Sequence, residues 1–184
     1  MSMILFALWF FLPAGLANSA PLLANRIPWL RNFKTPLDFG RHWRGKRLLG
    51  NNKTWRGLLF GIAIGIATAW LQQILFNNFA WAQTISQDVD YSSINVIALG
   101  GLLGAGALLG DALESFFKRR ISIDPGESWF PLDQADYIVG GLLASSLVVS
   151  LTLQQYIIVF VIWFCLHLLS VYTGYILGVR ERPI

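Results

Sequence analysis

Acidic and basic side chains recur at helical spacing in the string GDALESFFKRR. Asp111, Ser115 and Lys118 stand at positions i, i+4 and i+7, so a helix that continues to the basic cluster places them on one face. Glu114 lies close to the same face. This face combines carboxylates with an ammonium group, as a site for a charged ligand requires.

A second acidic pair follows in the string PLDQADYIVGG. Asp133 and Asp136 are three residues apart, about one helical turn, and can point toward the same place. Mg²⁺ takes one or two carboxylates together with phosphate oxygens, and Lys or Arg neutralises the charge that the metal leaves. Asp111, the acidic pair and the basic cluster therefore form a candidate site for a metal-bound polyphosphate.

Most of these residues also have a structural interpretation. Lys118, Arg119 and Arg120 are typical of cationic anchors that contact anionic lipid at a membrane surface. Asp133 or Asp136 can serve as an N-cap for the helix that follows. For the basic cluster considered alone, the anchor interpretation is favoured.

Asp111 is harder to explain by structure alone. It ends a glycine-rich apolar run, and an ionisable group at membrane depth implies a partner, a cavity or an ion. The glycines of this run favour close helix packing over close approach of a ligand. His167, in the last apolar segment, favours an interhelical hydrogen bond over a proton relay.

The elements that must position these residues are apolar helices. The chain is 55% hydrophobic and 13% charged, whereas soluble domains carry about a quarter charged residues. Gln154 and Gln155 are the polar break between the last two apolar segments. We predict an all-α, polytopic membrane protein with five transmembrane helices, at about residues 3–18, 57–76, 94–112, 137–153 and 156–178.

The first apolar segment has a rival interpretation as a cleaved signal peptide, because small residues follow it. No basic residue precedes it, however, and a dense basic stretch comes after it, which is the reverse of a signal peptide. We therefore expect a membrane helix there. The single Cys165 excludes an internal disulfide framework.

The basic residues predict the orientation. All fourteen Lys and Arg residues lie in residues 21–56, in residues 118–120 and in the tail at Arg180 and Arg182. With five spans these regions share one face, which the positive-inside rule assigns to the cytoplasm. The N-terminus is then outside and the C-terminus cytoplasmic. We predict one membrane-embedded domain, residues 1–184, with cytoplasmic loops at about 21–56 and 113–136.

The first of these loops contains PLDFGRHWRGKRLLGNNKTWRG. Basic residues alternate with aromatic residues, a pattern that favours a segment lying at the level of the lipid headgroups. Residues 50–54 also suit a turn that presents backbone N–H groups and the ammonium of Lys53 to phosphate. Their spacing is not that of a P-loop.

Together these strings resemble the CDP-archaeol synthase family, which are integral membrane CTP:lipid-phosphate cytidylyltransferases related to the CDP-diacylglycerol synthases. The resemblance covers most of the chain and includes LPAGLANSAP and PGESWFPLDQADYIVGG. The Ser-x-x-Lys-Arg element of the latter enzymes is matched by Ser115, Lys118 and Arg119, and their Asp-x-x-Asp pair by Asp133 and Asp136. Their His-Gly-Gly element is replaced here by Pro-Gly-Glu.

The resemblance implies transfer of a cytidylyl group from CTP to a lipid phosphate, with Mg²⁺ required and with no covalent enzyme intermediate. Lys118 and Arg119, with the Asp-x-x-Asp pair, are the expected catalytic residues, because Lys and Arg stabilise the charge of the leaving pyrophosphate. The expected metal ligands are Asp111, Asp133 and Asp136, and the expected substrate-binding residues are Lys53, Thr54, Arg56, Ser115, Asp38 and Asn18.

The implied partners are CTP, a lipid phosphate of the archaeal ether or phosphatidic acid type, and membrane lipids, but no nucleic acid. The active site is expected on the cytoplasmic face of the cell membrane. Two other functions fit the residues alone. One is a small transporter with Asp111 and His167 along its path, and the other is a non-catalytic protein that binds anionic lipid through its basic loop.

Overall fold

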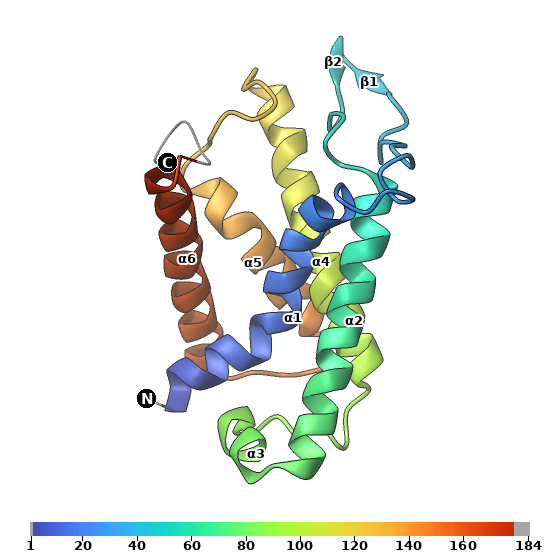
Figure 1. The fold of residues 1–184 in the computed structure, drawn as a ribbon. Helices are drawn as coiled ribbons and strands as arrows, with labels where there is room; N and C mark the ends of the chain where they lie inside the picture. The colour runs from blue at the N-terminus through green and yellow to red at the C-terminus, as the bar shows by residue number, and fades with distance from the viewer. Residues whose placement is uncertain (1, 179–184) are drawn as a thin grey trace.

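The structure, a computed structural model, describes residues 2–178, and the regular secondary structure of this part of the chain is almost entirely helical (Figure 1). The all-α prediction is confirmed, because the named strands within the described residues are only two residues long each. In chain order the elements are α1 (Ser2–Ala24), β1 (His42–Trp43), β2 (Lys46–Arg47), α2 (Trp55–Asn78), α3 (Ala80–Ser86), α4 (Val96–Arg120), α5 (Leu132–Ser145) and α6 (Leu153–Ile176).

Four of the described helices, α1, α2, α4 and α6, are long and apolar enough to cross a membrane. Helix α5 has 14 residues, so at 1.5 Å per residue it is about 21 Å long and shorter than a bilayer's hydrocarbon core. The protein is thus an integral membrane protein with four candidate spans among its described residues, one fewer than the sequence predicts. The tail with Arg180 and Arg182 lies outside the described residues.

The predicted boundary between the last two apolar segments is wrong. Helix α5 ends at Ser145, residues 146–152 form the connection, and Gln155 lies in the first turn of α6. Thr152 and Gln155 form a capping box, in which each side chain accepts the other residue's backbone N–H. The two glutamines start a helix because the side chain of Gln155 satisfies one of the unpaired N–H groups there.

The connections also differ from the predicted loops. Helix α1 continues through Pro21 to Ala24, and α4 continues through its basic cluster to Arg120. The two connections at the basic end of the bundle are therefore residues 25–54 and 121–131. The short helix α3 lies between the predicted second and third spans, and its Trp81 packs edge-on against Trp9 of α1.

Aromatic side chains of α1 fill the centre of the bundle. Phe6, Phe10 and Phe11 are fully buried, and the ring of Phe11 contacts Tyr137 of α5 and Trp163 of α6. Helix α1 therefore lies between the other helices (Figure 1).

Glycines bring the neighbouring helices into backbone contact. A Cβ on Gly65 of α2 or on Gly100 of α4 would collide with the other residue's carbonyl oxygen, and the same holds for Gly106 of α4 and Gly140 of α5. The expectation that the glycines serve helix packing is confirmed, since only residues without a side chain permit this approach.

Candidate active site

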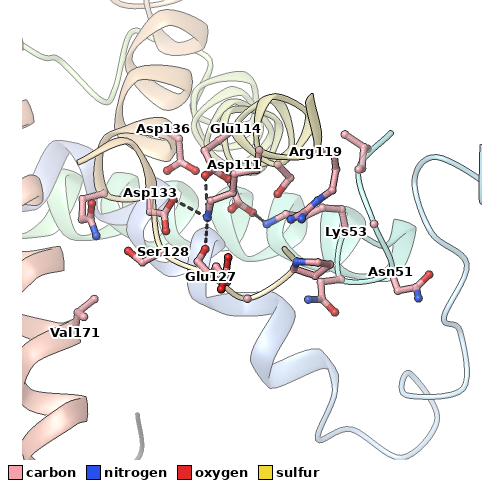
Figure 2. A pocket seen from close by; sticks show the side chains of 18 of the residues that line it. Asn51, Lys53, Asp111, Glu114, Arg119, Glu127, Ser128, Asp133, Asp136 and Val171 are labelled. Carbon is pink, nitrogen blue, oxygen red and sulfur yellow. Dashed lines mark hydrogen bonds and ion pairs between the residues drawn. The ribbon is translucent and has the colours of Figure 1, made fainter. Parts of the chain in front are cut away.

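Three carboxylates from α4 and α5 meet at the basic end of the bundle. One ligand oxygen from each of Asp111, Glu114 and Asp136 lies within 4.8 Å of the others, and Figure 2 shows the three side chains pointing toward one another. Carboxylate oxygens at this spacing suit a hard divalent cation. The cluster could therefore hold a metal ion, with Glu114 in addition to the predicted Asp111 and Asp136.

Gly110 explains how α5 comes close enough to contribute to the cluster. A Cβ on Gly110 would collide with the backbone carbonyl of Asp136. Gly110 immediately precedes Asp111, so the residue that admits the α5 backbone is next to the residue that presents a carboxylate. The close packing of α4 on α5 at Gly110 therefore also brings Asp136 to the cluster.

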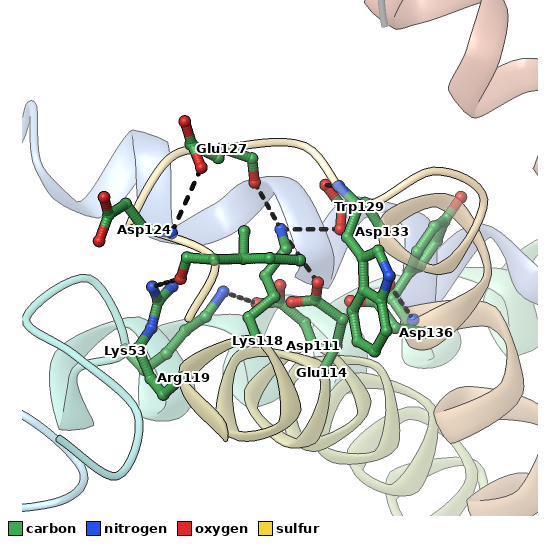
Figure 3. A network of polar contacts seen from close by, with 12 residues as sticks. Lys53, Asp111, Glu114, Lys118, Arg119, Asp124, Glu127, Trp129, Asp133 and Asp136 are labelled. Atoms are coloured by element: carbon green, nitrogen blue, oxygen red, sulfur yellow. Dashed lines mark hydrogen bonds and ion pairs between the residues drawn. The ribbon is translucent and has the colours of Figure 1, made fainter. Parts of the chain in front are cut away.

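Lys118 is the centre of a polar network beside the cluster (Figure 3). Its Nζ lies 3.0 Å from Oε1 of Glu114 and 2.8 Å from Oδ1 of Asp133, and it donates a hydrogen bond of 2.7 Å to the carbonyl of Glu127. Asp133 also accepts the backbone N–H of Trp129 at 3.0 Å. Lys118 and Asp133 thus tie the 121–131 connection to α4 and α5.

The alternative role of the acidic pair as helix caps is wrong. Pro131 is the N-cap of α5, and no side chain caps it. Asp133 and Asp136 instead lie within α5, one helical turn apart. Asp136 reaches the carboxylate cluster, while Asp133 contacts Lys118.

Lys53 approaches the cluster from the other side. Its Nζ lies 2.5 Å from Oδ2 of Asp111, so the pair joins residues 58 positions apart in the chain. Lys53 extends toward Asp111 in Figure 2. The structure thus places Lys53, an expected substrate-binding residue, in contact with the carboxylate cluster.

Thr54 and Arg56, which follow Lys53 in the string KTWRG, make structural contacts. Thr54 is the N-cap of α2 and accepts the N–H of Gly57. Arg56 is buried and donates to the carbonyl of Leu30 and to the side chain of Asn25. Both residues therefore fix the start of α2, although their atoms also line a cavity.

Asp38 organises its own loop and lines neither of the cavities described below. It pairs with Arg47 at 3.1 Å and accepts the backbone N–H groups of Gly40, Leu49 and Gly50. Burial alone would raise the pKa of Asp38, but the guanidinium and the three N–H groups outweigh it and hold that pKa well below its usual range. These contacts give Asp38 a structural role in the 25–54 connection.

Two cavities meet at the Lys53–Asp111 pair. The first cavity, of about 730 Å³, is lined by residues 49–53, by the carboxylate cluster and by Ser115, Lys118, Arg119, Asp133 and Gln134. The second cavity, of about 1220 Å³, runs along α1, α2 and α6. Its lining includes Gly15, Asn18, Ser19, Leu22, Thr54, Arg56, Leu108, Trp163, Leu166 and Ser170.

His167 lines both cavities, and its ring lies 5.5 Å from that of Tyr137 in α5. Sequence reasoning assigned it an interhelical hydrogen bond, or a place on the path of a transporter, and no role in the cytidylyltransferase site. It also left Glu114 out of the metal ligands, although the spacing of three from Asp111 was a signal that could have identified it. No comparable signal in the sequence indicated that His167 lines the same cavity as the carboxylates.

A profile of known proteins described as "CarS-like: CDP-archaeol synthase" matches residues 1–184. The chain belongs to this family. A CDP-archaeol synthase of Thermococcus onnurineus is 35% identical over 185 residues, covering 100% of this chain and 98% of that one. A CDP-archaeol synthase of Methanocaldococcus jannaschii is 35% identical over 182 residues, covering 97% and 96%.

A solved structure, described as that of an intramembrane enzyme for archaeal membrane lipids biosynthesis, has the same fold. The two superpose with a TM-score of 0.70 at 31% identity, over 89% of this chain and 91% of that one. The family resemblance predicted from the sequence strings is confirmed. Within the family fold, the carboxylate cluster and the two lysines lie in one cavity.

Proposed function

We propose that this protein transfers a cytidylyl group from CTP to an archaeal lipid phosphate and releases pyrophosphate. The observation that carries the proposal is the carboxylate cluster, flanked by Lys53 and Lys118 in the first cavity. A nucleoside triphosphate is highly anionic and is bound in proteins by a divalent cation together with Lys or Arg. The family to which the chain belongs is named for the same product.

The donor set fits Mg²⁺. Asp111, Glu114 and Asp136 offer hard carboxylate oxygens within 4.8 Å of one another, and Asp133 is a fourth carboxylate at the same cavity. When bound, Mg²⁺ supplies neutralisation of phosphate charge and polarisation of the phosphoryl group. The carboxylate of Asp133 is paired with Lys118. In our proposal it becomes a further metal ligand when it separates from that lysine.

The basic residues hold the phosphates. Lys53 and Arg119 line the first cavity with Ser115, and Lys118 neutralises the carboxylates beside them. An oxygen of the lipid phosphate attacks the α-phosphorus of CTP as the bond to the oxygen bridging the α- and β-phosphorus breaks, and pyrophosphate leaves. Positioning and electrostatic stabilisation are sufficient for this in-line displacement.

The second cavity is the proposed site for the lipid. Its polar end contains Lys53, Arg56 and Asn18, and its walls include Trp163 and Leu166 of α6. A phosphate at the polar end lies next to Asp111, which both cavities share. Thr54 and Asn18 have hydroxyl and amide groups at the same end.

We also propose that the chain crosses the membrane five times. Helix α5 begins at the basic end, whereas Gln155, at the start of α6, donates to Asp88 in the connection at the opposite end. The chain must therefore traverse the bundle between Asp133 and Gln155, and α5 with residues 146–152 covers that distance. The basic connections then lie in the cytoplasm, with the N-terminus outside and the site on the cytoplasmic face.

The test supplies purified protein in detergent with CTP, Mg²⁺ and either an archaeal ether-lipid phosphate or phosphatidic acid. We expect a CDP-lipid, identified by mass, and pyrophosphate, both lost when the metal is chelated. Asp136→Asn should lower kcat by about a hundredfold or more, because one cluster ligand is lost. Asp88→Asn, which lies at the opposite end, is the matched control.

Intact CTP with every lipid phosphate would overturn the proposal. Ion or solute flux through proteoliposomes without CTP would then favour the transporter. Lipid binding with no turnover would favour the non-catalytic protein. In a binding experiment with Mn²⁺, Glu114→Gln and Asp133→Asn distinguish which of the two carboxylates is the ligand.

A further inference from the structure

The β1–β2 hairpin is attached to the end of α4 by contacts centred on Arg120. Arg120 donates from Nη1 to the carbonyl of Trp43 at 2.7 Å and from Nη2 to the carbonyl of Lys46 at 3.3 Å and to that of Arg47. In return, Lys46 donates to the carbonyl of Arg120 at 3.0 Å and to the hydroxyl of Ser122. These contacts join segments more than 70 residues apart, since Arg120 and Arg47 are separated by 73 positions.

Aromatic rings complete the attachment. Trp43 stacks on Phe116 of α4, with ring centroids 5.9 Å apart and planes at 18°. The guanidinium of Arg120 lies 5.4 Å from the Trp43 ring and 4.9 Å from the Phe116 ring. Arg120 therefore faces the hairpin and directs three hydrogen bonds from its Nη atoms to hairpin carbonyls.

The hairpin is connected to the wall of the first cavity through Asp38. Arg47, whose carbonyl Arg120 holds, pairs with Asp38. Asp38 accepts the N–H groups of Leu49 and Gly50, and both of these residues line the first cavity. Leu37, next to Asp38, donates to the carbonyl of Lys53 at 2.8 Å.

We infer that Arg120 is a positioning residue, which clamps the hairpin of residues 42–47 to α4 and so holds residues 49–53 against the carboxylate cluster. This inference rests on the proposed function for its kinetic consequence. Leu49 and Gly50 line the first cavity and not the second. Loosening the clamp should therefore weaken the binding of CTP more than that of the lipid phosphate.

The experiment compares Arg120→Ala and Arg120→Lys with wild type. Lysine keeps the charge but lacks the planar fork that reaches three carbonyls. We expect both variants to raise KM for CTP by about tenfold while kcat stays within about twofold. Arg41→Ala, which removes an exposed cation from the same loop and leaves its backbone hydrogen bonds intact, is the matched control.

Hydrogen exchange gives a readout that needs no activity. Peptides covering residues 42–53 should exchange faster in both Arg120 variants, while those of the α2–α4 interface should be unchanged. Lys46→Met removes the hydrogen bonds from Lys46 to Arg120 and Ser122 and should give the same local pattern of exchange. This variant replaces the Arg120 variants in the experiment if they do not fold.

An Arg120→Lys protein indistinguishable from wild type would overturn the clamp, because it would assign the residue a role of charge alone. Unchanged exchange of residues 42–53 in Arg120→Ala and Lys46→Met would also overturn it. If wild type made no CDP-lipid but the exchange pattern were as expected, the clamp would stand and the proposed function would fail.

Discussion

The two sides of the site are held by different forces. On the acidic side, α4 and α5 are joined through glycines whose backbones touch, so the carboxylate cluster depends on shape. On the basic side, Lys53 ends a connection without regular helix that is held by one buried carboxylate, Asp38, and by Arg120. Substitutions that change side-chain volume should therefore perturb the acidic side most. Substitutions that remove a charge or a hydrogen bond should perturb the basic side most.

Among the changes that test this comparison, the largest effect is expected from Gly110→Ala. The added methyl group collides with the carbonyl of Asp136, and a backbone atom cannot rotate away as a side chain can. Overpacking of this kind costs about 1–3 kcal/mol, and separation of Asp136 from Asp111 should lower kcat by more than about tenfold. Thermal unfolding and CDP-lipid formation in detergent measure the two effects.

Gly101→Ala is the matched control on the same helix. A Cβ there would meet Ile66 at 3.6 and 3.7 Å, which is ordinary contact. Activity and unfolding temperature should stay close to those of wild type. Equal damage from both substitutions would mean that helix propensity or general packing, and not the approach of α5, determines the outcome.

A smaller effect is expected from Asp38→Asn. The amide cannot form the ion pair with Arg47 and has one acceptor oxygen where the carboxylate has two, so some of the N–H groups of Gly40, Leu49 and Gly50 lose their partner. We expect a local loss of about 1–3 kcal/mol, with faster hydrogen exchange of residues 38–50 and unchanged exchange at the α4–α5 interface. Uniformly faster exchange would contradict the separation of the two sides.

The smallest expected effect is a loss of stability of the 25–54 connection at acidic pH. Because the fold holds the pKa of Asp38 below its usual range, its stabilisation is complete above the unfolded value of about 4 and is lost as the pH falls from there toward the folded pKa. Pepsin, which is active at these pH values, should cleave the 25–54 connection faster as the pH decreases. In Asp38→Asn this part of the pH dependence should be absent, and an unchanged pH profile would contradict the assignment.

Local spacing in the sequence brought Asp111, Ser115 and Lys118 onto one face of a helix, but it left Glu114 out of the expected metal ligands and included Asp133, which contacts Lys118. Asp111 and Lys118 lie on one face because α4 continues to Arg120, and the glycines that admit α5 are visible as a glycine-rich run. Gln155 was misassigned because a glutamine reads as a polar break unless Thr152 is recognised as its capping partner.

The basic side was less predictable because its contacts join distant residues. The pairing of Lys53 with Asp111 spans 58 positions, and that of Arg120 with Trp43 spans 77. Asp38 was expected to bind substrate because it matches a family position, but a single position does not reveal which backbone N–H groups fold onto it. Arg120 follows two basic residues, and nothing in that run distinguishes a clamp from an anchor.

The junction of the two cavities has a consequence for inhibitor design. They share Asn51, Asn52, Lys53, Asp111, His167 and Val171, and their other lining residues are separate. In the proposed function each substrate therefore has a compartment of its own. A compound that links a cytidine diphosphate mimic to an isoprenoid chain would fill both compartments at once. Its second half would bind at the high effective concentration set by the linker, so such a bisubstrate compound should bind more tightly than either half alone.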